Sequence, residues 1–367
     1  MKPYRVIISG GGTGGHIFPA LAIADTIKKH YPDTEFLFVG ADDRMEMERV
    51  PAAGYPIVGL SISGFNRTHL FGNVKVLQKL FKSLRKAKKI VRDFRPDVVI
   101  GVGGYASGPT LWSATSLGIP TLIHEQNSYA GVTNKLLGKR ISRVCTTYDN
   151  MERFFPKEKI VLVGCPVRKD LEESKISKEE ALAYYGFDLR KKTILVVGGS
   201  LGARTINRSV EVGLPKVAEA GVNLIWQTGR YYQEQAQEAL KAYPDAPIAC
   251  SDFIVRMDLA YAAADLVISR AGAGTIAELS LLAKPAILVP SPNVAEDHQT
   301  KNAMALVDKE AAILVRDADA EEQLMKKTIE VVNDDALLAK LKTNIAPLAH
   351  PHSAELIVDE VMKLIEK

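Results

Sequence analysis

A short buried strand that runs into a glycine turn and then into a helix recurs along this chain. In the example at residues 264–278, the strand 264–268 leads into small residues, and helical spacing begins at Thr275. Small residues let a ligand approach the main chain, and the N–H groups and dipole of a helix start near Gly274 attract phosphate oxygens. Glu278, about one turn later, is placed to accept hydrogen bonds from sugar hydroxyls. Tight packing of the helix on the strand is the alternative use of these glycines.

Two further copies of this unit, at residues 4–30 and 192–214, give the two halves of the chain one plan. The repetition predicts an α/β protein built from two doubly wound, Rossmann-like domains with parallel sheets. A break at Gly164-Cys-Pro-Val-Arg168 marks the joint between them. The expected parts are an N-terminal domain, a C-terminal domain and a last helical segment that packs back on the first domain: 1–163, 164–346 and 347–367.

The composition is that of an ordinary globular protein, with 47% hydrophobic and 25% charged residues in 367 positions. No apolar run approaches the roughly 18 residues that span a bilayer, and the N-terminus lacks a signal-peptide pattern. Three scattered cysteines without a C-x-x-C pair indicate reduced thiols in the cytoplasm. The net charge of +4 is mild, and we expect no nucleic-acid partner.

Residues 65–95 carry the most uneven charge pattern in the chain. From residue 67 to residue 95 there are ten Lys or Arg residues and a single acid, Asp93. Apolar residues recur there at three- and four-residue steps, namely Leu70, Phe71, Val74, Leu77, Leu80, Phe81 and Leu84. A basic amphipathic helix of this kind, with an apolar approach loop at 65–71, suits an anionic membrane surface. A helix that packs on the core with a solvated basic back explains the apolar stripe but explains the charge imbalance less well.

The first glycine run, Gly10-Gly-Gly-Thr-Gly-Gly15, ends at His16 and has two interpretations. It fits the dinucleotide fingerprint G-x-G-x-x-G, but that fingerprint expects an acid at the end of the second strand, and Asp42 comes late. Binding of an oxygen-rich substrate near the loop fits equally well. Histidine titrates near neutrality, so His16 at the helix start is a candidate general base. A helix-start residue that only hydrogen-bonds the loop is the other interpretation.

Other candidate site residues lie where strands end or where the two halves join. Glu125 and Asn127 follow the strand 120–124, while Asn134 in the next helical stretch is interpreted as structural. Arg168 at the joint is placed to reach a diphosphate between the domains.

The second half of the chain supplies the remaining candidates. Ser200 offers a hydroxyl and an N–H to phosphate, the main chain of Ile254 suits a planar base, and Gln299 suits a sugar hydroxyl. Asp317-Ala-Asp319 resembles the D-x-D that holds a metal with a nucleotide. Because it precedes a helical stretch, we expect helix capping there and no metal held by the protein.

Five motifs occur in order along the whole chain: Gly11-Gly-Thr-Gly-Gly-His16, Gly103-Gly-Tyr-Ala-Ser-Gly-Pro109, His124-Glu-Gln-Asn127, Gly198-Gly-Ser200 with Gly202-Ala-Arg204, and Asp297-His-Gln-Thr-Lys-Asn302. Together they closely resemble the MurG family, the bacterial N-acetylglucosaminyltransferases of peptidoglycan synthesis. The resemblance implies a GT-B fold with an interdomain cleft, and a peripheral protein on the cytoplasmic face of the inner membrane. It also implies transfer of GlcNAc with inversion from UDP-GlcNAc to the muramoyl 4-hydroxyl of undecaprenyl-diphosphate-MurNAc-pentapeptide (lipid I), which gives lipid II.

The resemblance also implies roles for individual residues. Glu278 looks like the acid that binds the ribose, and His16 is our hypothesis for the base, with Glu125 a weaker candidate. Cys165 stands where the family commonly has Asn. No cofactor is required, and stimulation by a divalent cation is left open. The other positions that look like contacts to UDP-GlcNAc are Thr13, Gly14, Gly15, Asn127, Arg168, Ser200, Ile254, Gly274, Thr275 and Gln299.

Three rival functions fit parts of the sequence. A UDP-GlcNAc 2-epimerase shares this architecture and donor but needs no membrane patch and no lipid acceptor. An NAD-dependent dehydrogenase would use the first glycine run, which lacks the expected acid. A non-catalytic sensor would bind UDP-GlcNAc without turnover.

Overall fold

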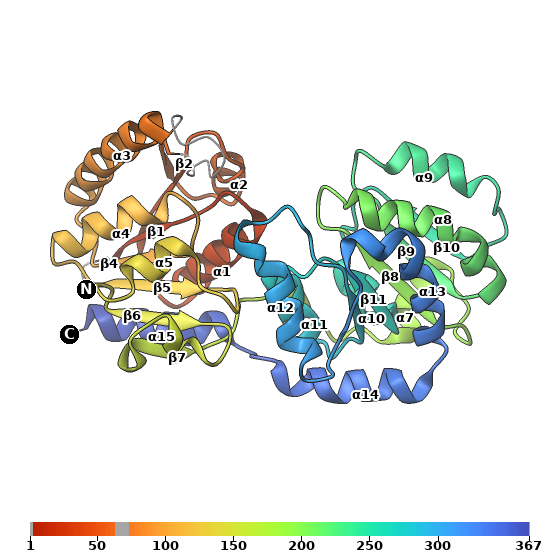
Figure 1. Cartoon of the computed structure of the whole chain (residues 1–367). Helices are drawn as coiled ribbons and strands as arrows, with labels where there is room; N and C mark the ends of the chain where they lie inside the picture. The colour runs from red at the N-terminus through yellow and green to blue at the C-terminus, as the bar shows by residue number, and fades with distance from the viewer. Residues whose placement is uncertain (1–2, 63–72, 367) are drawn as a thin grey trace. The chain divides into compact units, whose positions relative to one another are not determined.

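The computed structural model describes residues 3–62 and 73–366, and it leaves the side chains of residues 73–77 and 295 undescribed. The chain divides into two compact units. The N-terminal unit comprises Met1–Arg168 with His350–Lys367, and the C-terminal unit comprises Lys169–Ala349. The last helix, α15 (Ser353–Ile365), therefore belongs to the N-terminal unit although it lies at the far end of the chain (Figure 1).

The described residues of the N-terminal unit form a seven-stranded parallel sheet in the order β3-β2-β1-β4-β5-β6-β7. Its strands are β1 (Arg5–Ser9), β2 (Glu35–Ala41), β3 (Ile57–Leu60), β4 (Val98–Gly101), β5 (Thr121–Glu125), β6 (Arg143–Thr146) and β7 (Ile160–Leu162). The other helical elements of this unit are α1 (Gly14–His30), α2 (Glu46–Ala52), α3 (Asn73–Phe94), α4 (Ser107–Ser116), α5 (Val132–Leu137), η2 (Met151–Arg153) and η3 (Lys157–Lys159).

Apolar residues fill both faces of this sheet, as expected for parallel strands covered by helices. Successive side chains of a strand point to opposite faces, so Ile8 packs beneath α1 and α15 while Ile7 packs beneath α3 and α4. Five apolar residues of α15 join the first of these cores, namely Ile357, Val358, Val361, Met362 and Leu364. The C-terminal segment thus completes a core that begins at residue 6.

The basic stretch forms α3, which packs against α4 and the sheet. Its inner positions Ala87 and Val91 are buried, and Leu80 and Leu84 are half-buried. Phe81, which the predicted apolar stripe included, is instead 67% exposed. The expected approach loop and the side chains of Leu70, Phe71, Val74 and Leu77 lie outside the described residues. The described half of α3 therefore packs on the core by one face and presents an aromatic side chain together with its lysines on the other.

The described residues of the C-terminal unit form a six-stranded parallel sheet in the order β10-β9-β8-β11-β12-β13. Its strands are β8 (Thr193–Val197), β9 (Asn223–Gln227), β10 (Ile248–Ser251), β11 (Leu266–Ser269), β12 (Ala286–Leu288) and β13 (Ile313–Leu314). Its helical elements are α6 (Lys169–Glu172), α7 (Lys178–Tyr185), α8 (Arg204–Ala220), α9 (Gln233–Leu240), α10 (Met257–Ala263), α11 (Ala273–Leu281), η4 (Ala295–Asp297), α12 (His298–Val307), η5 (Asp317–Asp319), α13 (Ala320–Val332), α14 (Asp335–Ile345) and η6 (Ala346–Leu348).

Each sheet reverses its winding once, between β1 and β4 in the first and between β8 and β11 in the second. Open α/β sheets bind ligands at this switch point, outside the carboxyl ends of the strands. The predicted pair of doubly wound parallel sheets is therefore confirmed, and each unit carries one switch point. In the part of the chain that the structure describes, no helix combines the length and apolarity needed to cross a membrane.

Candidate functional site

The switch point of the N-terminal unit is built from two glycine loops in backbone contact. The N–H of Gly11 donates to the carbonyl oxygen of Gly103 at 3.2 Å. A Cβ at Gly104 would lie only 2.4 Å from the carbonyl oxygen of Gly11, and Gly103 and Gly104 have φ of +96° and +87°. Only glycine fits these positions, so the glycines after β1 and β4 bring the two strand ends together.

The N–H groups beside the first glycine loop bind a carboxylate of the protein itself. Glu46 is 1% exposed, and it accepts hydrogen bonds from Gly12 N at 2.8 Å and Ala41 N at 3.0 Å. A Cβ at Gly11 would lie 2.2 Å from this carboxylate. A dinucleotide fingerprint offers the N–H of its second glycine to a diphosphate, whereas Gly12 offers it to a buried negative charge. This geometry argues against the dehydrogenase interpretation. Sequence reasoning missed Glu46 because it lies beyond the strand end where an acid is sought.

His16 lies in the first turn of α1 and is half-exposed. Its Nδ1 lies 3.1 Å from Oε1 of Gln126. A Cβ at Gly103 would lie 2.8 Å from Cε1 of His16, so the missing side chain leaves the space that the imidazole occupies. Thr13 at the N-cap and Gly15 are exposed, and Gly14 is half-buried. The loop therefore presents His16 together with the first turn of a 17-residue helix.

Gln126 and His124 connect His16 to the interior of the sheet. Nε2 of Gln126 donates to the carbonyl oxygen of Val102 at 2.8 Å and lies 3.2 Å from Nδ1 of His124. Nε2 of His124 lies 2.9 Å from the carbonyl oxygen of Gly164. His124 is fully buried, and burial lowers its pKa to about 4, so its imidazole is neutral near pH 7. Sequence reasoning did not single out Gln126, because one residue in a polar motif gives no sign of its partners.

Glu125 is 2% exposed and anchors the loop that follows β5. Its Oε1 accepts from the backbone and side-chain nitrogens of Asn127 at 3.1 and 3.4 Å. Its Oε2 accepts from Gly131 N at 3.0 Å and from Nδ2 of Asn134 at 2.8 Å. A carboxylate engaged in this way shapes the loop and is poorly suited to take a substrate proton, so the geometry disfavours Glu125 as the base. The structural interpretation of Asn134 is confirmed.

The glycine loop of the C-terminal unit has a different environment. Gly199 and Ser200 are exposed, ahead of the 17-residue helix α8. Gly199 and Gly202 have φ of +92° and +78°, and a Cβ at Gly202 would lie 2.0 Å from the carbonyl oxygen of Thr228. The turn is thus fixed by close backbone packing, while the hydroxyl of Ser200 faces solvent near the start of a long helix.

Gln227, at the end of β9 and 2% exposed, ties this loop to the segment around Ile254. Its Nε2 donates to the carbonyl oxygen of Gly199 at 3.0 Å, and its Oε1 accepts from Ile254 N at 2.9 Å. The predicted main-chain position Ile254 therefore has its N–H engaged within the protein and its side chain buried. Sequence reasoning missed Gln227, which reads as one more residue of a buried strand.

A second helix start in the C-terminal unit lies after β11. Gly274 and Thr275 are half-buried in the first turn of α11, and a Cβ at Gly274 would meet no atom within 4 Å. Glu278 lies one turn later, half-buried, and its Oε2 accepts from the hydroxyl of Tyr261 at 2.8 Å. The tyrosine orients the carboxylate on the same helix whose N-terminus is open to a ligand.

Two more of the predicted site residues, Gln299 and Arg168, lie close to the ends of loops in the C-terminal and N-terminal units, respectively. Oε1 of Gln299 accepts from Ser291 N at 2.8 Å, which holds the loop before α12. Arg168 is half-buried and is the last residue of the N-terminal unit before the division, and its contact with a diphosphate stays a prediction.

The D-x-D pair of the C-terminal unit is engaged with arginines. Asp317 pairs with Arg270 at 2.5 Å and accepts from the hydroxyl of Thr205 at 3.1 Å. Asp319 pairs with Arg316 at 2.7 Å. Asp319 stands at the N-cap position of α13, as the capping prediction expects, but its side chain makes no capping hydrogen bond. These carboxylates instead fasten the loops around β11 and α13.

Two Rossmann-like units of this kind, each with a switch point at its strand ends, are the domains of the GT-B fold class. Residues 6–146 match the model of the glycosyltransferase family 28 N-terminal domain, and residues 193–357 match that of the glycosyltransferase family 28 C-terminal domain. The chain belongs to glycosyltransferase family 28.

Curated relatives and solved structures extend this assignment over the full length. The chain is 64% identical, over 367 residues and 100% of both chains, to the UDP-N-acetylglucosamine--N-acetylmuramyl-(pentapeptide) pyrophosphoryl-undecaprenol N-acetylglucosamine transferase of Parabacteroides distasonis. It is similar to the crystal structure of Acinetobacter baumannii MurG, with a TM-score of 0.81 and 30% identity over 98% of this chain and 100% of that one. A UDP-N-acetylglucosamine 2-epimerase structure aligns over 98% of this chain and 96% of its own with a TM-score of 0.62 at 13% identity, which is a likeness of fold alone.

Proposed function

We propose that this protein is an inverting glycosyltransferase that makes lipid II. It transfers GlcNAc from UDP-GlcNAc to the 4-hydroxyl of N-acetylmuramic acid in undecaprenyl-diphosphate-MurNAc-pentapeptide and releases UDP. The observation that carries the proposal is the 64% identity, over the full length of both chains, to a relative whose name states this donor and this type of acceptor. The epimerase alternative rests on a shared fold only.

The C-terminal unit supplies the groups that suit the donor. The starts of α8 and α11 offer N–H groups and dipole ends to the diphosphate, near Ser200 and Gly274. Glu278, oriented by Tyr261, suits the ribose hydroxyls. The N–H of Ile254 donates to Gln227, so its main-chain carbonyl oxygen is the group we propose for the uracil edge. Negative charge grows on the diphosphate as the sugar leaves, and preorganised donors stabilise that charge most in the transition state. We expect the reaction to need no cofactor.

The N-terminal unit supplies the base. Nε2 of His16 takes the proton of the acceptor hydroxyl as its oxygen bonds to C1 of GlcNAc. The bond between C1 and the diphosphate oxygen breaks in the same step, and its electron pair leaves with UDP. The attack comes from the face opposite the leaving group, so the configuration at C1 inverts, and no covalent enzyme intermediate forms.

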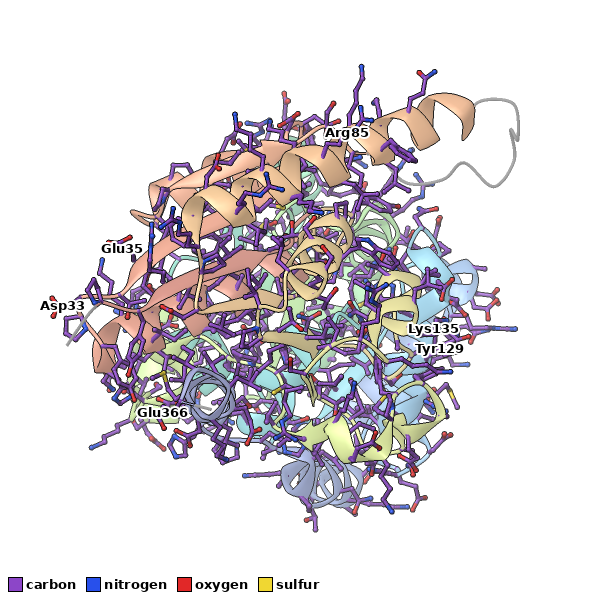
Figure 2. The ribbon with its side chains drawn as sticks, turned by 90° about the vertical axis from the view of Figure 1, so that its left-hand side faces the viewer. Asp33, Glu35, Arg85, Tyr129, Lys135 and Glu366 are labelled. Atoms are coloured by element: carbon purple, nitrogen blue, oxygen red, sulfur yellow. The ribbon has the colours of Figure 1, made fainter. Side chains whose placement is uncertain are left out.

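The N-terminal unit also presents a surface suited to a membrane that holds the lipid acceptor. On α3, Phe81 is 67% exposed, and the guanidinium of Arg85 lies 5.9 Å from its ring centroid (Figure 2). On the adjacent α4, Trp112 is 44% exposed, and the guanidinium of Arg140 lies 4.1 Å from its ring. Exposed aromatic side chains with cations beside them suit the headgroup region of an anionic leaflet. We propose peripheral binding at the cytoplasmic face of the inner membrane.

A third cation, Lys135 of α5, lies over an aromatic ring. Nζ of Lys135 lies 4.4 Å from the ring centroid of Tyr129, and both side chains are labelled in Figure 2. Leu136 beside them is 74% exposed. Helices α4 and α5 contact each other, so this pair extends the set of aromatic and cationic side chains beyond α3 and α4.

The deciding experiment incubates the purified protein with radiolabelled UDP-GlcNAc and a short-chain lipid I analogue. We expect labelled disaccharide-lipid and release of UDP in equal amounts. Binding of UDP-GlcNAc without transfer, with GlcNAc epimerised instead, would favour the epimerase. Binding with neither reaction would favour a sensor.

A further inference from the structure

A chain of hydrogen bonds inside the N-terminal unit runs from two backbone carbonyls to His16. His124 is hydrogen-bonded to the carbonyl oxygen of Gly164 and to Gln126. Gln126 is also hydrogen-bonded to the carbonyl oxygen of Val102 and to His16. Carbonyl oxygens can only accept, so they fix where the protons of this chain lie. These two carbonyl oxygens are the fixed ends of the chain, and they determine which atom donates and which accepts in every hydrogen bond.

The first fixed end sets the tautomer of His124. Its Nε2 lies 2.9 Å from Gly164 O, so Nε2 carries the proton and donates. Burial lowers the pKa of His124 to about 4, so the ring is neutral near pH 7 and Nδ1 holds a lone pair. Nδ1 of His124 therefore accepts, at 3.2 Å, from Nε2 of Gln126.

The second fixed end sets the orientation of the Gln126 amide. Nε2 of Gln126 also lies 2.8 Å from Val102 O, and an oxygen in that position would face another oxygen. Both N–H groups of the amide are thus engaged by acceptors, one on Val102 and one on His124. Gln126 is 1% exposed, so turning the amide over would leave two buried acceptors without a donor. Its Oε1 is fixed as the atom that faces His16.

We propose that Gln126 is a positioning residue that holds His16 as the Nδ1–H tautomer. Its Oε1 accepts from Nδ1–H of His16 at 3.1 Å, and the lone pair of the neutral imidazole therefore lies on Nε2. This inference rests on the proposed function, in which that lone pair takes the acceptor proton. The proton moves from the hydroxyl to Nε2, and the imidazolium keeps its Nδ1–H bond to Gln126. The amide oxygen therefore orients the ring before transfer and stabilises its charge afterwards.

The glycine at position 103 supports this arrangement from the other side of the ring. A Cβ there would lie 2.8 and 2.9 Å from Cε1 and Nδ1 of His16. The imidazole thus sits between the backbone of the second glycine loop and the amide of Gln126. A half-turn of the ring about its Cβ–Cγ bond would put Cδ2 in the place of Nδ1 and break the hydrogen bond to Gln126.

The test combines the tautomer with kinetics in the full-length protein. Long-range ¹H–¹⁵N NMR of ¹⁵N-histidine protein distinguishes Nδ1–H from Nε2–H, and the His16→Asn spectrum assigns His16 among the seven histidines. We expect wild-type His16 as Nδ1–H and Gln126→Met with His16 shifted to Nε2–H. Turnover of Gln126→Met should fall about 10- to 100-fold with little change in donor KM, as for partners that orient a functional histidine.

Two further variants separate positioning from general damage. Gln126→Glu keeps an oxygen for Nδ1–H of His16 but loses the N–H donors to Val102 O and His124. It should therefore lower the free energy of unfolding, yet retain the tautomer and recover part of the turnover lost in Gln126→Met. Gln227→Met makes the same change at a buried amide of the C-terminal unit, where it should raise donor KM and leave the His16 tautomer as in wild type.

The outcomes distinguish this inference from the proposed function. A wild-type His16 found as Nε2–H overturns the inference, even if Gln126→Met does not fold. Wild-type turnover of Gln126→Met, together with an inactive His16→Ala, also overturns the inference. The proposed function stands in that case. A wild-type protein that holds Nδ1–H but transfers no GlcNAc would instead overturn the proposed function.

Discussion

The two glycine loops of this protein share a plan and differ in what their N–H groups face. After β1, the loop N–H of Gly12 donates to the buried carboxylate of Glu46, and the neighbouring loop packs onto it through Gly103 and Gly104. After β8, Gly199 and Ser200 are exposed, ahead of α8. The same strand, turn and helix therefore carry a loop N–H bonded to an internal carboxylate in one unit and an exposed serine at the turn in the other.

The comparison shows that a glycine-rich turn at a strand end does not by itself specify a phosphate site. In the first loop an internal acid already accepts from the N–H of Gly12. In the N-terminal unit the carboxylate leaves the loop to present His16, which suits a part in catalysis. In the C-terminal unit the open helix starts suit a diphosphate. Four predictions, in order of decreasing effect, test whether the N-terminal unit carries the base and the membrane surface while the C-terminal unit binds the diphosphate.

The largest effect is expected from His16→Ala. Removing a general base lowers turnover by about 10²- to 10⁴-fold. Because Ser200, Gly274 and Glu278, which we propose hold the UDP part of the donor, lie on the C-terminal unit, the Kd for UDP should stay near the wild-type value. Steady-state kinetics and calorimetry measure the two quantities. Near-normal turnover with intact donor affinity would remove His16 as the base.

The next effect is on stability. Glu46→Ala leaves the N–H of buried Ala41 without its acceptor, which costs about 1–3 kcal/mol, whereas the N–H of exposed Gly12 can turn to water. We expect the free energy of unfolding of the N-terminal unit to fall by about 1–3 kcal/mol, measured by denaturant titration. Glu48→Ala on the same helix, where Glu48 is exposed, is the matched control and should change it by less than about 0.5 kcal/mol. Equal effects of the two variants would show that Glu46 does not fasten the loop.

The third prediction extends the comparison to the surfaces of the two units. Lys82, Lys86 and Lys89 are exposed on α3, and each cation near an anionic surface contributes about 1 kcal/mol. Reversing all three to Glu should weaken binding to anionic vesicles by at least roughly 100-fold, measured by co-sedimentation.

The matched control changes the net charge equally on the C-terminal unit. Lys216, Lys326 and Lys327 are exposed on α8 and α13. Reversing them should leave vesicle binding close to wild type. If both triple variants lose binding to the same extent, net charge and not α3 governs the association.

The fold was predictable from sequence because its signal is local. Each strand, turn and helix lies within a few tens of residues, and the pattern repeats in both halves of the chain. His16, Ser200 and Glu278 were found in the same way, because each stands at a recognisable place in such a unit. The charge pattern of α3 was equally visible.

The residues that sequence reasoning missed act through partners far along the chain. Glu46 is hydrogen-bonded to Gly12, 34 positions away in the sequence. Gln126 is hydrogen-bonded to His16 at a separation of 110 positions, and Gln227 to Ile254 at a separation of 27. All three are buried polar side chains, and the residues next to them in sequence do not show which groups they contact. Only the packing of neighbouring loops reveals them, and the same packing turned Glu125 from a candidate base into a loop anchor.

The smallest expected effect is also the most direct test of the comparison. Ser200→Asp gives the open loop of the C-terminal unit a carboxylate of its own, as Glu46 gives one to the first loop. Two like charges a few ångströms apart near solvent repel by about 1–2 kcal/mol, so the Kd for UDP should rise roughly 10-fold. Ser200→Asn is the matched control, since it has the same shape without the charge and should change the Kd less. Because Ser200 is exposed, neither variant should alter unfolding. If Ser200→Asp and Ser200→Asn weaken UDP binding equally, the loss comes from the missing hydroxyl. The loop at Ser200 is then not the anion site. If Asp weakens UDP but leaves uridine binding unchanged, the added charge acts on the diphosphate, and the presence or absence of an internal carboxylate is what separates the two loops.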